Sequence, residues 1–142
     1  MQEWKRGFSE RLRYVQTHWV KQFESALDSH VAPVFDDLGN FLRNQGFSTS
    51  VPLREQGRRS FKFELAENAY LLLIFKATAI GEFELRREAF APGRDPQLSK
   101  SVERVGDLKD GWAVEQFQAA LDAFLEHLGG QAAPVEAELA VA

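Results

Sequence analysis

Three histidines are the first candidates for metal chemistry in this chain: His18, His30 and His127. His18 and His30 are twelve residues apart in a segment with helical periodicity, which separates them by roughly 18 Å along a helix. The sequence contains neither a His-x-x-x-His nor a His-Glu-x-x-His spacing, which would place two ligands on one helix face. We therefore expect no metal site and no cofactor, and we interpret each histidine as a structural or surface residue.

The carboxylates also lack the spacing that acid–base catalysis needs. Asp36 and Asp37 are neighbours, and on a helix their side chains point about 100° apart, so they cannot share a proton as a catalytic dyad does. Glycine-rich phosphate loops and serine-nucleophile motifs do not occur, and the chain has no cysteine. No catalytic residue can be assigned, and the sequence favours a non-enzymatic function over an enzyme.

Arg87 is the charged residue that falls in phase with the apolar positions of a predicted strand. Such a residue either extends its guanidinium to the rim of the sheet or anchors an anion. Arg87, Tyr70 and His30 are therefore the polar set that we predict for a small-molecule site, in a Phe-lined cavity between sheet and helices. The chain has 12 Phe, and core packing is the simpler interpretation of most of them.

Arg54, Arg58 and Arg59 form a basic cluster at a predicted turn. Such a turn can contact a phosphate backbone, and it can equally protect an edge strand from aggregation. The whole chain carries 17 Lys and Arg against 21 Asp and Glu, a net charge of −4, which argues against nucleic acid as the main partner. Nucleic-acid contact through these three arginines is therefore the third hypothesis for function.

A long amphipathic helix is the first of the elements that would position these residues. Apolar residues recur every three or four positions over 9–45. Ser9 is expected as the N-cap, and Gly46 as the residue that ends the helix. Pro33 falls inside the pattern without loss of phase. We therefore expect one helix kinked near Pro33, at about Ser29; the alternative is two helices, with Pro33 beginning the second.

An antiparallel β-meander of four to five strands is predicted to follow. A short edge strand is expected over 51–53, alternating strands over 60–65 and 83–88, and a short fifth strand over 101–105. The strand over 70–76 is different because it is apolar on both faces, which is typical of a strand covered on both sides. Tyr70, Leu72 and Ile74 make up its second apolar face.

A last amphipathic helix, from about residue 110 to 128, completes the predicted order of elements. The two helices need an apolar partner, which a sheet face supplies, so the sequence predicts an α+β fold. We expect a single domain over 1–130, with the C-terminal helix packed on the sheet, and a mobile tail over 131–142. Two layers cover only one face of the sheet, which leaves Tyr70, Leu72 and Ile74 in need of a further cover.

This surplus of apolar surface is the basis of the leading functional hypothesis. We expect a non-enzymatic interaction or adaptor protein that forms a homodimer, or binds another protein, through Tyr70, Leu72 and Ile74 and the long first helix. The alternative is the small-molecule site described above, with a small apolar ligand. Neither a signal peptide nor a membrane-spanning run is evident. We therefore expect no membrane partner and a cytoplasmic location, which the lack of cysteine fits.

Overall fold

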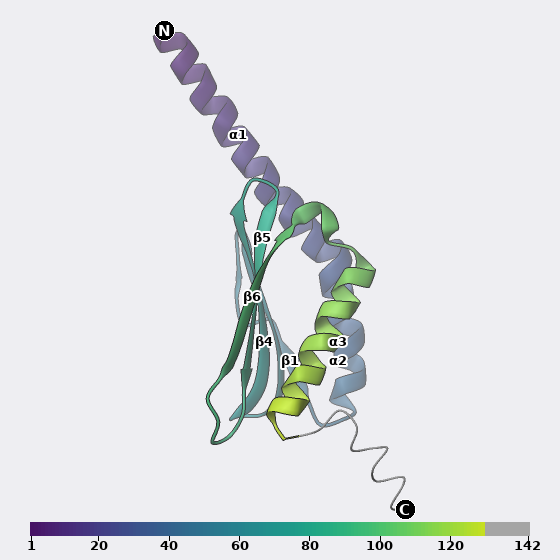
Figure 1. The fold of residues 1–142 in the computed structure, drawn as a ribbon. Helices are drawn as coiled ribbons and strands as arrows, with labels where there is room; N and C mark the ends of the chain where they lie inside the picture. Colours follow the sequence, from purple (N-terminus) through teal and green to yellow (C-terminus); the bar gives the residue numbers. More distant parts are fainter. Residues whose placement is uncertain (130–142) are drawn as a thin grey trace, which may run out of the picture.

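The structure is a computed structural model that describes residues 1–129; the tail predicted over 131–142 lies outside them. It consists of two layers, an antiparallel sheet and a layer of helices on one of its faces (Figure 1). The elements in chain order are α1 (Gln2–Ala26), the π-helical turn η1 (Leu27–Val31), α2 (Ala32–Arg43), β1 (Ser48–Ser50), β2 (Arg54–Glu55), β3 (Arg58–Ala66), β4 (Ala69–Ala79), β5 (Glu82–Phe90), β6 (Gln97–Arg104), the 3-10 turn η2 (Val105–Asp107) and α3 (Asp110–His127). The predicted α+β class is confirmed.

The first 43 residues form one helical rod, in which α1 continues through η1 into α2. The backbone N–H of Ala32 donates to the carbonyl of Leu27, five residues back. This wider turn adds a residue just before Pro33, whose ring would crowd a regular turn. The expected kink near Pro33 is thus a π-helical turn.

The C-terminal end of the rod agrees with the prediction, and the N-terminal end does not. Gly46 has φ 93°, a conformation that favours glycine, and lies just beyond the end of α2 as expected. The helix begins at Gln2, so the prediction of Ser9 as the N-cap was wrong. Trp4 and Phe8 continue the four-residue spacing of the apolar positions beyond Ser9, and residues 2–8 are helical with them.

The sheet has the order β1-β3-β4-β5-β6, with β2 also paired to β3, so it is the predicted meander. The first edge strand lies at Ser48–Ser50 rather than at 51–53, because Pro52 has no N–H to donate to a neighbouring strand. The fifth strand of this order, β6, spans Gln97–Arg104 and is longer than predicted. It is an edge strand with mostly exposed side chains, so its sequence lacks the apolar alternation of a half-buried strand.

Phenylalanine fills the space between sheet and helices. The Phe side chains with at most 1% exposure are Phe23, Phe61, Phe63, Phe75, Phe83, Phe117 and Phe124. They pack against one another and against Phe35, with ring centroids 4.9 Å apart for Phe35 and Phe61 and 5.9 Å apart for Phe61 and Phe117. The core therefore joins the rod, the sheet and α3, and it fixes the point at which α1 leaves the body of the molecule.

Candidate docking surface

The N-terminal part of α1 projects away from the body of the molecule (Figure 1). We call residues 2–18 the arm, and the set Trp4, Phe8, Leu12, Val15 and Trp19 the arm stripe. The exposed fractions of its first four members are 58%, 45%, 43% and 40%. Phe23, the next apolar residue along the same face, is fully buried under the sheet. The same helix face is thus core at one end and exposed at the other.

The spacing of the arm stripe is regular enough to form a seam. Trp4, Phe8 and Leu12 recur eleven residues later as Val15, Trp19 and Phe23, and an eleven-residue repeat keeps a seam nearly straight along a helix. The rings of Trp4 and Phe8 stack with their centroids 5.1 Å apart. An isolated helix of about this length is only marginally stable in water, so a partner on the stripe would stabilise the arm.

The arm is basic in an otherwise acidic chain. Residues 1–21, which include the arm, contain the cations Lys5, Arg6, Arg11, Arg13 and Lys21 and the anions Glu3 and Glu10. At 100° per residue, Arg6 and Arg13 point more than about 130° away from the centre of the stripe, while Lys5 and Arg11 flank it at about 60°. The stripe therefore has an apolar centre and a sparse cationic border.

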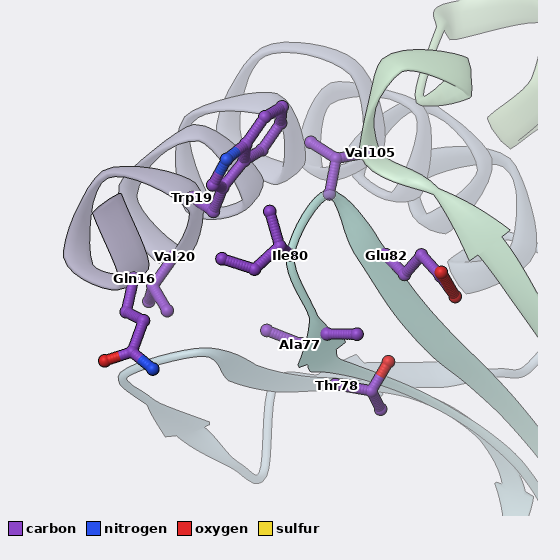
Figure 2. Close-up of a pocket in the computed structure, with 9 residues that line it drawn as sticks. Gln16, Trp19, Val20, Ala77, Thr78, Ile80, Glu82 and Val105 are labelled. Atoms are coloured by element: carbon purple, nitrogen blue, oxygen red, sulfur yellow. The ribbon is translucent and has the colours of Figure 1, made fainter. Parts of the chain in front are cut away.

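A hollow of about 270 Å³ lies where the arm meets the body, and we call it the root pocket (Figure 2). Its walls come from α1, from the end of β4 and from the turn into β5. The lining residues are Gln16, Trp19, Val20, Ala77, Thr78, Ala79, Ile80, Glu82 and Val105. Most of the lining is apolar, and Glu82 contributes a carboxylate at one side.

A tight turn closes one wall of the root pocket against α1. Gly81 has φ 74°, and a Cβ built on it would lie 3.7 Å from the ring of Trp19. The turn therefore sits directly against the indole, while Ile80 beside it is 51% exposed. The arm stripe thus leads without interruption into a partly apolar hollow.

Tyr70, Leu72 and Ile74 alternate along β4 with the core residues Leu71, Leu73 and Phe75, so they lie on the sheet face opposite to the helices, and they are half-buried. Side chains of the sheet itself cover part of Tyr70. Tyr70 stacks on Phe90 with centroids 4.5 Å apart, and the Lys62 ammonium lies 4.5 Å from the Tyr70 ring centroid. Lys62 also pairs with Glu64 at 2.8 Å. This open sheet face is therefore apolar along β4 and charged along the strands beside it.

The edge strand β6 adds apolar residues to the same face. Leu98 is paired with Glu88 and Val102 with Glu84, both of which lie on the open side of β5. The exposed fractions of Leu98 and Val102 are 63% and 64%. The open sheet face is a second candidate surface, but it is flatter and more charged than the arm stripe.

The three residues predicted for a small-molecule site do not converge. The Arg87 guanidinium is on the helix side of the sheet and donates to Gln116 at 2.7 Å and to Ser101 at 3.2 Å. Desolvation lowers the pKa of Arg87, and the nearby Glu103 carboxylate opposes that effect. Tyr70 is on the opposite face, and His30 lies in η1, where its Nδ1 is 2.6 Å from an Asp110 carboxylate oxygen. The hydrogen bond between Arg87 and Gln116 connects β5 with α3. The contact between His30 and Asp110 connects the rod with the start of α3.

The three arginines of the predicted basic cluster are also divided. Arg59 points to the helix side, is 5% exposed and lies 2.6 Å from the Asp28 carboxylate. Arg54 is exposed and 3.8 Å from the same carboxylate. Arg58 is exposed on the open sheet face and shares a shallow hollow with Lys76 and Glu84. Only Arg54 and Arg58 of the three present their charges to solvent.

Three further findings bear on the site. Within residues 1–129 we find no cluster of three or more His, Asp or Glu side chains that could hold a metal ion. None of the helices described is long and apolar enough to cross a membrane. The chain matches no protein-family model, no curated protein and no solved structure.

The sequence pattern predicts only part of the arm stripe. The periodicity over 9–45 includes Leu12, Val15 and Trp19, and the long first helix was expected to bind a partner together with Tyr70, Leu72 and Ile74. The signal that the helix begins earlier was Trp4, one turn before Phe8. The residue at which the stripe changes from buried to exposed could not be predicted from the sequence, because it depends on where the sheet ends.

Proposed function

We propose that this protein is a non-enzymatic interaction domain of the adaptor type, and that it self-associates through the arm. The observation that carries this proposal is the arm stripe, because four consecutive apolar residues of one helix face are 40–58% exposed. A large aromatic and aliphatic seam of this kind in water favours association. The lack of cysteine in the sequence supports a reducing compartment, and we place the protein in the cytoplasm.

Tyr70, Leu72 and Ile74 serve a secondary role in this proposal. These three residues are half-buried, whereas Trp4, Phe8, Leu12 and Val15 are exposed, so the open sheet face leaves less apolar area exposed than the arm does. A second protein bound there would leave the arm free to pair, as an adaptor requires. The small-molecule and nucleic-acid alternatives have no comparable support, because the residues predicted for each point to different faces of the sheet.

The oligomeric state of the full chain tests the proposal. We expect sedimentation equilibrium at micromolar concentrations to give the mass of a dimer, and Leu12→Glu to give the 16.1 kDa monomer. Leu72→Glu is the matched control, since it puts the same charge on the open sheet face and should leave the dimer intact. A wild-type chain that remains monomeric at every concentration, or a Leu12→Glu variant that still forms dimers, would contradict the role of the arm.

A further inference from the structure

We infer that two copies of this chain pair through antiparallel arms, and that Trp4 of each copy occupies the root pocket of the other. This inference rests on the proposed self-association and adds its geometry. The pocket would then be completed by a residue that the same chain cannot supply. Trp4 precedes Trp19 by fifteen residues, which places it roughly 22 Å from the pocket along its own helix.

The spacing of the arm stripe is the first argument for this arrangement. Read in either direction from a point between residues 11 and 12, apolar residues stand at matching distances: Trp4 matches Trp19 and Phe8 matches Val15. Two antiparallel copies therefore bring Trp4 against Trp19 and Phe8 against Val15, with Leu12 beside the two-fold axis. A self-complementary surface of this kind is what a two-fold interface requires.

The root pocket is the second argument. Trp19 lines it together with Gln16 and Val20, so the pocket lies at the level of α1 that Trp4 of the partner copy would reach. The indole would meet Ile80, which is 51% exposed, at the turn between β4 and β5. Figure 2 shows the side chains of Trp19, Val20 and Ile80 around this hollow. The partner's tryptophan would thus bury apolar surface on both copies.

Charge complementarity is the third argument. Lys5 follows Trp4 directly and flanks the stripe, and Glu82 is the residue of the pocket lining that carries a charge. A basic arm tip would therefore meet a carboxylate when Trp4 enters the pocket. Arg6 and Arg13 lie on the back of each arm and stay in solvent, where water and salt weaken the repulsion between the two arms.

The body of the molecule selects among the possible registers. Moving the arms further past each other would place Trp4 against Phe23, but Phe23 is fully buried in the core. Withdrawing them until Phe8 meets Phe8 of the other copy would leave Val15 and Trp19 of both copies without a partner. The register that pairs Trp4 with Trp19 uses the whole stripe and ends where the β4–β5 turn begins.

Disulfide crosslinking can test the register, because the chain has no cysteine of its own that could form other crosslinks. In the proposed register, Phe8→Cys of one copy faces Val15→Cys of the other. Like positions are separated by seven residues, roughly 10 Å along the axis, too far for a disulfide. We expect covalent dimers from an oxidised mixture of the two variants and none from either variant alone. Covalent dimers from Phe8→Cys alone would overturn the inference.

A double-mutant cycle tests whether Trp4 occupies the root pocket of the other copy. We expect Trp4→Ala to weaken the dimer at least tenfold and Ile80→Ala to weaken it less. The double variant should be no weaker than Trp4→Ala alone, since both changes remove one contact. The two residues are too far apart to interact within one chain, so such coupling requires the partner copy. Effects that simply multiply would overturn the placement of Trp4 in the pocket.

The outcomes separate this geometry from the proposed function. A dimer by mass that fails to crosslink between positions 8 and 15 rejects the geometry and leaves self-association standing. A monomer at every concentration rejects both. A monomer that also sediments with vesicles of equal parts phosphatidylcholine and phosphatidylglycerol would instead assign the basic, aromatic arm to an anionic lipid surface.

Discussion

At the scale of single residues, the most informative pair is Arg59 and Asp28. Arg59 is 5% exposed, and its Nη1 donates to an Asp28 carboxylate oxygen at 2.6 Å. The Nε of Arg59 is buried and has no hydrogen-bond partner among the described residues. A buried cation depends on its counter-ion because the interior solvates charge poorly. Asp28 thereby joins the helical rod to the start of β3.

Removal of this counter-ion should be costly. We expect Asp28→Ala to lower the free energy of unfolding by about 2 kcal/mol, because it leaves the Arg59 charge buried and unpaired, although the Asp28 side chain is itself 55% exposed. Arg54→Ala is the matched control. Arg54 shares the Asp28 carboxylate at 3.8 Å, but both side chains are largely exposed, so its loss should cost less than about 1 kcal/mol. Urea unfolding measures the free energy of unfolding of both variants. Equal decreases for Asp28→Ala and Arg54→Ala would contradict a special contribution of the pair between Arg59 and Asp28.

At the scale of elements, the arm differs from the other helices because little of it packs on the body. Gly7 lies in the first half of the arm, and a Cβ built there would meet no atom within 4 Å. Glycine weakens a helix by about 1 kcal/mol relative to alanine. An arm of this composition should fray in the monomer and become ordered when it pairs.

The replacement Gly7→Ala should therefore strengthen association. Each arm becomes more helical before it pairs, by about 1 kcal/mol, so the dimer dissociation constant should fall by roughly tenfold or more for two arms. Gly111→Ala is the control, because Gly111 is in α3 and also has open space around its Cβ position. It should leave the dissociation constant unchanged. Sedimentation equilibrium measures both, and an unchanged constant for Gly7→Ala would mean that the arm is already rigid in the monomer.

At the scale of the whole molecule, the body and the arm are stabilised in different ways. The body buries its Phe-rich core within one chain, as the fully buried Phe61 and Phe117 show. The exposed members of the arm stripe, Trp4, Phe8, Leu12 and Val15, can be buried only by a partner. Folding of the body and association of the arms are therefore linked through protein concentration, since binding of a partner to the folded state stabilises that state.

This linkage predicts a concentration-dependent melting temperature. We expect the wild-type melting temperature to rise by a few degrees when the protein concentration is raised a hundredfold, whereas Leu12→Glu should melt at one temperature throughout. At the lowest concentration the wild type and Leu12→Glu should have the same melting temperature, because Leu12 contributes nothing to the core of one chain. Scanning calorimetry or circular dichroism measures this. A lower melting temperature of Leu12→Glu in dilute solution would show that the arm packs on its own body.

Local patterns in the sequence determined the elements and the class of the fold. Periodicity identified the helices and the meander, and the in-phase position of Arg87 placed it on the helix side of the sheet, where it donates to Gln116. Such features depend on neighbours within a few residues, so the sequence alone contains them. The predicted candidate sets were less well determined, because Tyr70 and Arg87 lie on neighbouring strands but point to opposite faces of the sheet, and Arg87 is paired with Leu73 rather than with Tyr70.

Only the tertiary structure decided which apolar surface stays exposed. The same helix face is buried at Phe23 and exposed at Trp4, although the spacing is continuous between them. The difference arises because the sheet ends at the β4–β5 turn, where Gly81 lies against Trp19, and the rod continues beyond it. The length of one element relative to another is a property of the assembled layers, and no periodicity within a single element records it.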